Sequence, residues 1–95
     1  MAESSDNGKL SAVELGEAAL TTIAQLTGYQ PEAVTGLEWD GEDGAWKVTV
    51  AVLELSRIPN TTDVLGSYEV ELDEQGTLRG YRRAGRYTRG HADGD

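Results

Sequence analysis

The chain has 95 residues, a net charge of −9 and no cysteine. This length predicts one domain with a single modest core, and the lack of cysteine excludes disulfides, thiolate metal sites and cysteine nucleophiles. Because no apolar run approaches the ~20 residues of a membrane helix and the first residues lack the basic and apolar regions of a signal peptide, we expect a cytoplasmic protein without a membrane segment.

Charge and composition are distributed unevenly along the chain. Residues 1–76 hold fifteen acidic and three basic residues, a balance of −12, whereas residues 77–95 hold five arginines and two aspartates, a balance of +3. An acidic body is repelled by nucleic acid and anionic lipid, which favours a protein partner over either. Polar residues 1–9 and 90–95 predict flexible tails around one domain at 10–89.

A helix is predicted at the start of this domain. Ser11 followed by Glu14 is a capping box, and Gly28 is a typical C-terminal stop. Gly16 lies inside the predicted helix and marks either the close approach of a strand or a tolerated weak point on the surface. The expected apolar face consists of Val13, Leu20, Ile23 and Thr27, with Leu15, Ala19 and Leu26 beside them.

A first hairpin is predicted after the helix. Residues 29–33 are interpreted as a connector, residues 34–39 as a short strand, and residues 40–44 as a turn of Asp and Gly. Trp46, Val48, Val50 and Val52 then alternate with more polar residues, the period-2 pattern of a half-buried strand. This alternation changes parity at Leu53 and Leu55, which predicts a β-bulge or strong bend near residues 52–54.

A second hairpin follows a longer loop at residues 57–63. Residues 65–73 alternate through Tyr68, Val70 and Leu72, and residues 73–76 form a turn. Residues 78–88 are the last strand, whose pattern is interrupted by two glycines and an alanine. The predicted fold class is therefore α+β, with one N-terminal helix packed on an antiparallel meander of about four strands.

Catalytic and metal chemistry is poorly represented. The only histidine, His91, lies in the predicted C-terminal tail, where nothing orients it as a catalyst or ligand. The turn at residues 40–44 has some likeness to a calcium loop but lacks the later glutamate at EF-hand spacing, so a hairpin turn is the stronger interpretation. Glu69 and Glu71 are interpreted as solvent-facing or paired with arginines. We expect no enzymatic activity, no cofactor and no metal.

The strongest binding signal is a strip of arginine and tyrosine at the basic end. These residue types dominate protein interfaces, and they also stack on bases and contact phosphates. An internal alternative pairs Arg79 and Arg83 with Glu69 and Glu71 across the hairpin. The loop at 57–63, with Pro59, is open to two interpretations, a rigid crossover or a binding loop. The candidate partner-binding residues are Arg57, Tyr81, Arg82, Arg83, Arg86, Tyr87 and Arg89.

The ordered pattern as a whole resembles the GvpO family of gas vesicle accessory proteins. The likeness covers about residues 10–89 and lies in the succession of short motifs. These are Trp46-Lys47-Val48-Thr49-Val50, Glu54 with Arg57-Ile58-Pro59, Asp63 with Leu65, Tyr68-Glu69-Val70, Leu72-Asp73, Gly76-Thr77-Leu78, Tyr81-Arg82-Arg83 and Arg86-Tyr87-Thr88-Arg89. The N-terminal extension is shorter than is common in the family.

The resemblance implies a non-enzymatic accessory or minor component required for forming gas vesicles, the gas-filled protein shells that provide buoyancy. Its implied partners are other gas vesicle proteins, accessory or shell, and its implied place is the cytoplasm or the vesicle itself. A nucleic-acid-binding regulator of gas vesicle gene expression or RNA stability is the alternative. Pairing of exposed edge strands into a homodimer is compatible with both. The family supplies no catalytic residues to transfer.

Overall fold

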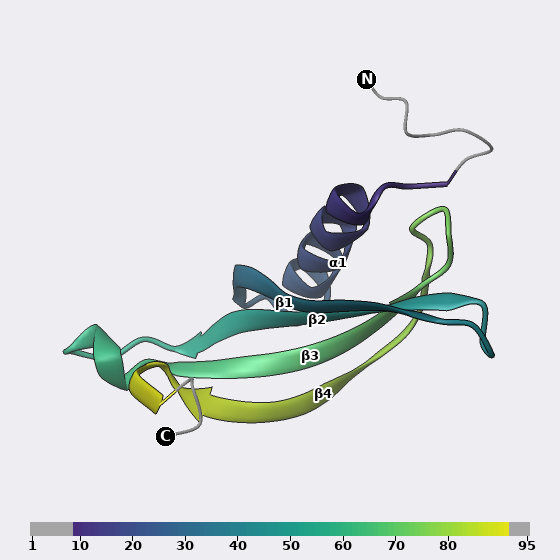
Figure 1. Cartoon of the computed structure of the whole chain (residues 1–95). Helices are drawn as coiled ribbons and strands as arrows, with labels where there is room; N and C mark the ends of the chain where they lie inside the picture. Colours follow the sequence, from purple (N-terminus) through teal and green to yellow (C-terminus); the bar gives the residue numbers. More distant parts are fainter. Residues whose placement is uncertain (1–8, 92–95) are drawn as a thin grey trace.

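The computed structural model describes residues 9–91, in which one helix is followed by a four-stranded antiparallel sheet (Figure 1). The strands pair in chain order, so the sheet is a meander. This confirms the expected α+β class. The expected tails lie outside the described residues, except for residues 9, 90 and 91. The elements are α1 (Ala12–Thr27), β1 (Gln30–Asp40), β2 (Ala45–Leu55), β3 (Val64–Leu72), β4 (Leu78–Thr88), and the short 3-10 turns η2 (Asn60–Thr62) and η3 (Arg89–His91).

Local side-chain chemistry sets both ends of α1. The Ser11 hydroxyl accepts a hydrogen bond from the Glu14 N–H at 3.2 Å, and the Glu14 carboxylate accepts one from the Ser11 N–H at 2.9 Å. Gly28 ends the helix with φ 79°, and its N–H donates to the Ala24 carbonyl. Both predicted caps are confirmed, because they depend only on residues within one helical turn.

The buried face of α1 differs from the predicted one. Leu15, Ala19 and Ile23 are fully buried, whereas Val13 is 70% exposed and Leu26 is 49% exposed. The helix carries apolar side chains on two neighbouring stripes, and its amphipathic pattern alone does not decide between them. The stripe of residues four apart became the core because it is the one that meets the sheet.

Gly16 marks the close approach of a strand. It is buried against β1, and a Cβ placed there would lie 3.2 Å from Cγ2 of Val34. This resolves the two interpretations of Gly16. The predicted connector at residues 29–33 is wrong, since β1 already pairs with β2 from Gln30 onward. Pro31 is tolerated there because β1 is an edge strand, in which one face of the backbone has no partner in the sheet.

The core lies between α1 and the helix-side face of the two central strands. The predicted alternation on β2 and β3 is confirmed, with Val48 opposite Val70 and Val50 opposite Tyr68. Both predicted hairpin turns are also present, and Gly44 and Gly76 adopt φ 64° and 85° in them. The buried cluster consists of Leu15, Ala19, Ile23, Val48, Val50, Val52, Tyr68, Val70 and Leu72.

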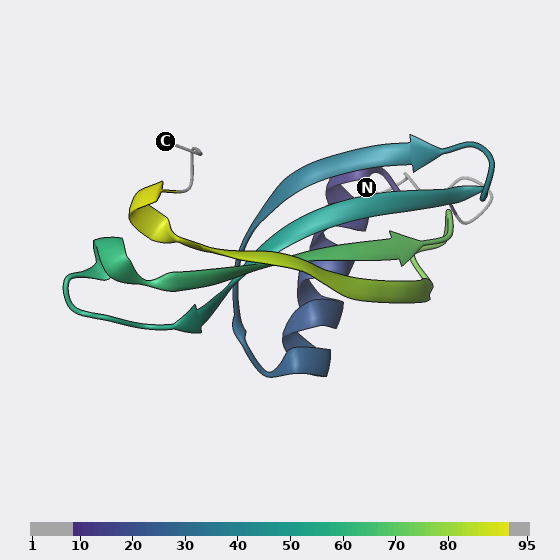
Figure 2. The same ribbon diagram turned by 90° about the horizontal axis from the view of Figure 1, so that it is seen from below.

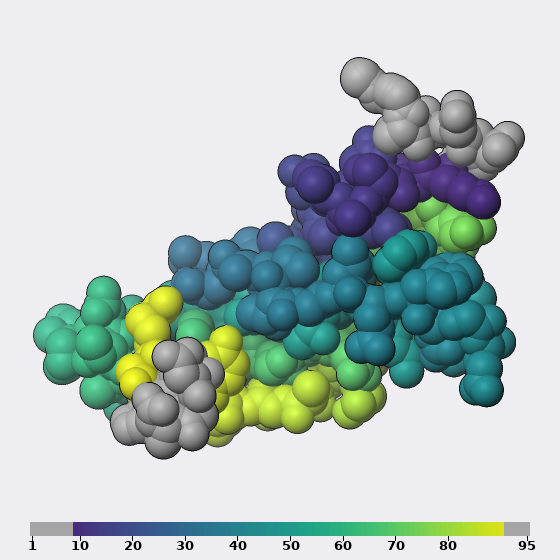
Figure 3. Space-filling model, in the orientation of Figure 1, coloured from purple at the N-terminus to yellow at the C-terminus, as the bar shows by residue number. Residues whose placement is uncertain are grey.

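The molecule is elongated, with extents of 47 × 28 × 22 Å, and the helix covers only part of it. Figure 2 shows α1 crossing the sheet near its hairpin end, while the end that carries η2 and η3 extends beyond the helix. The space-filling view shows the same division, with η2 and η3 at the left tip of the molecule and α1 above its middle part (Figure 3). Part of the sheet face on the helix side is therefore left for other contacts.

Candidate protein-binding surface

A bulge in β4 places two arginines on the same face of the sheet. Side chains three positions apart on a regular strand point to opposite faces, which would separate Arg83 from Arg86. Ala84 is an extra residue without a partner on β3. The side chains that follow it therefore point to the face opposite to the one they would take on a regular strand. Arg83 and Arg86 therefore lie opposite Tyr68 and Gly66, on the helix side of the sheet.

Glu54 connects these arginines to the centre of the sheet. It is the extra residue of the bulge between Leu53 and Leu55, which confirms the bend predicted there. Its side chain is only 4% exposed. Arg83 forms a two-nitrogen ion pair with its carboxylate, with Nε at 3.1 Å from Oε2, and Nε of Arg86 lies 3.4 Å from Oε1. Two guanidiniums thus surround one buried carboxylate.

Gly66 provides the space that Glu54 occupies. Gly66 is on β3 and lies opposite Val52 of β2, on the face of the sheet that is turned to the helix. A Cβ at this position would overlap the Glu54 carboxylate. Glycine in a strand often marks such a close approach by another group. A residue with a side chain here would push Glu54 out from beneath the arginines.

Electrostatics hold this cluster in one charge state. Hydrogen bonding to Glu54 raises the pKa of Arg83, and burial followed by the charge of Glu54 raises the pKa of Tyr68. Tyr29, directly after the helix, contributes to both shifts. The hydroxyl of Tyr68 lies 3.5 Å from Oε2 of Glu54. At neutral pH Arg83 is therefore positive and Tyr68 is neutral.

Exposed aromatic rings flank the arginines. Tyr81 is 45% exposed and Tyr29 is 37% exposed. The rings of Tyr81 and Tyr68 lie 6.4 Å apart, which places Tyr81 on the helix side of β4. Arg83 and Arg86 have side chains that are 40% and 62% exposed. We call the set of Tyr29, Tyr81, Arg83 and Arg86, with Glu54 beneath the arginines, the Glu54 surface.

The opposite face of the sheet holds two other members of the predicted strip, Arg82 and Tyr87. Arg82 forms an ion pair with Glu69 at 2.9 Å, within a shallow hollow of about 270 Å³. Tyr87 lies opposite Leu65 on this same face. The alternative that pairs Arg79 and Arg83 with Glu69 and Glu71 is wrong, because the extra residue Arg79 shifts the register and places Arg82 opposite Glu69. Arg79 donates instead to the Asp43 carbonyl at 2.7 Å.

The remaining two candidate residues, Arg57 and Arg89, lie at the far end of the sheet. Arg89 contacts Asp63 at 3.1 Å and Glu32 at 3.2 Å, and these contacts raise its pKa. Asp63 is buried, and its carboxylate also accepts a hydrogen bond from the Arg57 N–H at 2.7 Å. Arg89 thus ties β1, the 57–63 loop and the end of β4 together, and its charge is used inside the fold.

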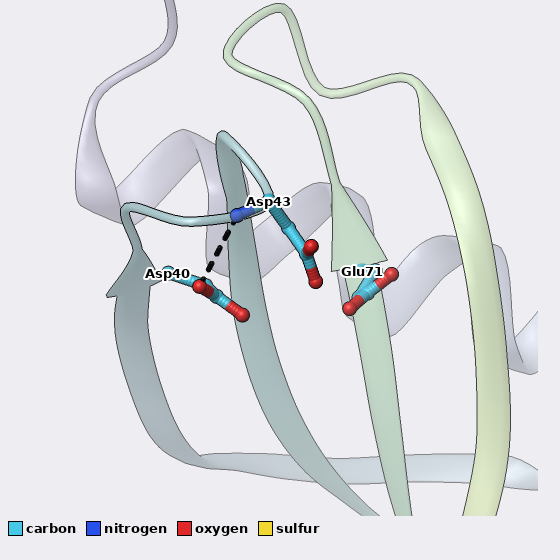
Figure 4. Close-up of side chains that lie close together, drawn as sticks. All are labelled: Asp40, Asp43 and Glu71. Carbon is cyan, nitrogen blue, oxygen red and sulfur yellow. Dashed lines mark hydrogen bonds between the residues drawn. The ribbon is translucent and has the colours of Figure 1, made fainter.

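The acidic turn between β1 and β2 brings three carboxylates together (Figure 4). Oxygens of Asp40, Asp43 and Glu71 lie within 4.8 Å of one another. Asp40 accepts hydrogen bonds from the N–H groups of Glu42 and Asp43, and the bond from Asp43 is the main cause of its lowered pKa. Lys47 lies 3.6 Å from Asp40. These contacts confirm the hairpin turn, and we assign no metal to it.

Sequence reasoning did not single out the residues that organise this region. Glu54 interrupts an apolar run between Leu53 and Leu55, and Gly66 interrupts another between Leu65 and the alternating part of β3. A lone carboxylate and a lone glycine inside strand patterns are signals of a buried ion pair and a close approach. The sequence does not show that Glu54 and Gly66 meet, because their contact depends on how β2 and β3 pair.

Comparison with known proteins identifies the family. The family model described as gas vesicle synthesis protein GvpO matches residues 1–93. The chain belongs to the GvpO family. Gas vesicle protein O of Streptomyces sp. (strain CB03234) is 52% identical over 75 residues, which cover 79% of this chain and 57% of that protein. Gas vesicle protein O of Haloferax mediterranei is 36% identical over 66 residues, which cover 70% of this chain and 46% of that protein.

The extent of these matches sets what the comparisons show. Gas vesicle protein O1 of Halobacterium salinarum is 39% identical over 51 residues, which cover 54% of this chain and 43% of that protein. The chain therefore spans about half the length of the curated relatives it matches. No solved structure matches it. None of the helices in the described part of the chain has the length and apolar character needed to cross a membrane.

Proposed function

We propose that this chain is a non-enzymatic accessory protein of gas vesicle formation, which binds other gas vesicle proteins during shell assembly through the Glu54 surface. Membership of the GvpO family supports the gas vesicle context. The observation that carries the binding role is the placement of Arg83 and Arg86 beside exposed tyrosines on one face of a chain of net charge −9. Its place of action is the cytoplasm, at the forming vesicle.

The composition of the surface supports a protein partner. Arginine and tyrosine are the residue types that most often dominate binding energy in protein interfaces. Here they lie together on the helix side of the sheet and are 37–62% exposed, so a partner has access to them. The surplus of one positive charge over Glu54 favours a partner segment that carries carboxylates, and such complementarity speeds association and selects the orientation.

The buried ion pair supports a preorganised surface. Glu54 fixes the guanidinium of Arg83 through two hydrogen bonds, so this side chain loses little rotational freedom when a partner binds. Arg86 has one longer contact at 3.4 Å and keeps donors directed to solvent. The first arginine therefore positions the surface and the second is available to a partner.

The distribution of positive charge argues against the nucleic-acid alternative. A nucleic-acid track needs several cations along one groove. The arginines of β4 are divided between the two faces of the sheet, and Arg82, Arg83 and Arg89 are each paired with carboxylates. The acidic body also repels phosphates. Binding of RNA by a regulator is the alternative that the experiments must test.

The decisive experiment replaces the exposed half of the surface. In cells that depend on this chain for gas vesicles, the double variant Arg86→Ala with Tyr81→Ala should produce few or no vesicles. Arg82→Ala is the matched control, since it removes an exposed arginine from the same strand but from the opposite face, and it should leave vesicle formation normal. Vesicle yield is measured by buoyancy and electron microscopy.

The folding state and the partner class are checked in parallel. Both variants should keep the wild-type thermal midpoint, since the removed side chains are exposed. A folded double variant that still forms normal vesicles would contradict the proposal. Co-purification of the tagged chain with and without nuclease separates the two partner classes, because gas vesicle proteins should be retained after nuclease, whereas a regulator of RNA would lose its partners.

A further inference from the structure

We propose that the 57–63 loop is a second docking element, which inserts Ile58 into an apolar pocket with an acidic rim on a partner protein. This proposal does not rest on the Glu54 surface or on the gas vesicle role. It depends on three observations: an isoleucine that the fold leaves outside, a loop held in one conformation, and a neighbouring arginine that forms no ion pair within the described residues.

Ile58 contributes almost nothing to the fold. Its side chain is 99% exposed, the largest exposure among the large apolar residues of the described chain. Single apolar side chains of intermediate exposure are ordinary on protein surfaces, but a fully exposed isoleucine gains no burial at all within its own chain. Figures 1 and 2 show that the 57–63 loop forms one tip of the molecule, beyond α1. A partner therefore meets Ile58 without obstruction.

Internal hydrogen bonds hold the loop in place. The Asp63 carboxylate accepts from the Arg57 N–H at 2.7 Å and from Nε of Arg89 at 3.2 Å. The Thr62 hydroxyl donates to the Pro59 carbonyl at 2.7 Å, and the Asp63 N–H donates to the Asn60 carbonyl at 3.0 Å. The residues on both sides of Ile58 are thus fixed, so Ile58 is presented from a preorganised support and little entropy remains to be lost on binding.

The C-terminal end of β4 closes against the same loop. The Arg89 N–H donates to the Asp63 carbonyl at 2.9 Å. A Cβ on Gly90 would lie 3.0 Å from the Thr61 carbonyl oxygen, so η3 packs tightly on the loop backbone. Asp63 itself is only 4% exposed. The buried carboxylate of Asp63 thus anchors the loop from inside, whereas the side chain of Ile58 is exposed.

Arg57 indicates the charge of the partner. Its N–H is bound to Asp63, but its guanidinium forms no ion pair with any residue in the range 9–91. Arg57 and Ile58 line a shallow hollow together with Thr62, Val64 and Thr88. An apolar contact at Ile58 with carboxylates near Arg57 satisfies both side chains. An anionic lipid surface is disfavoured as the occupant, because it is extended and would also face the acidic body, whereas an acidic rim faces only Arg57.

The first test maps what Ile58 touches. The photo-crosslinking residue p-benzoylphenylalanine is placed at position 58 in the native host, and at position 60 as the matched control, because Asn60 is an exposed residue of the same loop. A discrete crosslinked protein is expected from position 58 and a much weaker one from position 60. Equal or absent products from both positions would overturn the proposal, as would a crosslink to a second copy of this chain.

The second test measures the affinity of the crosslinked protein after purification. Ile58→Ser should weaken binding about 10- to 100-fold, the effect of losing one buried aliphatic side chain, and Ile58→Val should weaken it by about fivefold or less. Arg57→Ala should reduce the association rate and its salt dependence. Binding of Ile58→Ser at wild-type affinity would overturn the proposal. A confirmed partner unrelated to gas vesicles would support the Ile58 anchor, and the gas vesicle role would still be decided by the vesicle yield of the Glu54-surface variant.

Discussion

Two buried carboxylates of this protein are held by arginines from the same end of the chain, yet they do different things. Glu54 is 4% exposed and faces two guanidiniums, of Arg83 and Arg86. Asp63 is 6% exposed in its side chain and shares the single guanidinium of Arg89 with Glu32. The Glu54 cluster has two guanidiniums for one carboxylate, whereas the Asp63 cluster has one guanidinium for two carboxylates.

The ratio of arginines to carboxylates therefore distinguishes the two clusters. The Glu54 cluster belongs to the proposed binding surface, and the Asp63 cluster, which we call the structural lock, holds three segments of the fold together. Surplus positive charge at Glu54 lies on an exposed face and remains available to a partner. At Asp63 the charge of Arg89 is consumed by joining β1, the 57–63 loop and the end of β4. Three experiments test this contrast, and they are given from the largest expected effect to the smallest.

Removal of the two carboxylates should have unequal consequences for stability. Asp63→Ala takes away the acceptor of the Arg57 N–H and of Arg89, and we expect a loss of about 2–3 kcal/mol in the free energy of unfolding. Glu54→Ala leaves arginines that reach solvent, and we expect about 1–2 kcal/mol. Urea unfolding measures both. A larger loss for Glu54→Ala would contradict the assignment of Asp63 as the structural lock.

Filling the space over Gly66 should damage the first cluster alone. In Gly66→Ala the new methyl group overlaps the Glu54 carboxylate, and we expect destabilisation of about 1–3 kcal/mol, the usual range for overpacking. Gly85→Ala is the matched control, because a Cβ there has no neighbour within 4 Å. Equal midpoints for both variants in thermal unfolding would show that Glu54 moves aside at no cost.

The pH dependence of stability gives the smallest effect and reports on the Glu54 cluster. Burial and Glu54 raise the pKa of Tyr68 above its ordinary value of about 10, so the folded state keeps this proton where the unfolded state releases it. The resulting stability is fully present below about pH 10 and is lost as pH rises beyond that value. Tyr68→Phe should fall less steeply than wild type when urea unfolding is repeated above pH 10.

Much of the fold was predictable because local chemistry specifies it. The capping box at Ser11, the stop at Gly28, the two hairpin turns and the alternation of Val48 and Val50 each depend on residues within a few positions of one another. The bulge near Glu54 was also predictable, because the apolar pattern changes parity there. Each of these predictions is confirmed by the structure.

The sequence predicted candidate residues of the proposed binding surface, but it did not predict how they are arranged in space. Seven candidate residues, the arginine-tyrosine strip and Arg57, were predicted as one set, but the structure distributes them over two faces and the far end of the sheet. The extra residue Ala84 decides on which face Arg86 and Tyr87 lie. A bulge of one residue reverses the direction of every following side chain, and its presence depends on the pairing with β3.

The sequence by itself determined the ends of α1, the positions of the turns, the meander and the family. The tertiary structure alone decided which helical stripe is buried, that Gly16 meets Val34, and that Glu54 lies over Gly66 beneath Arg83. The physical reason is distance along the chain. Caps and turns are made by neighbours, whereas a core stripe and a buried ion pair are made by residues that only strand register and helix docking bring together.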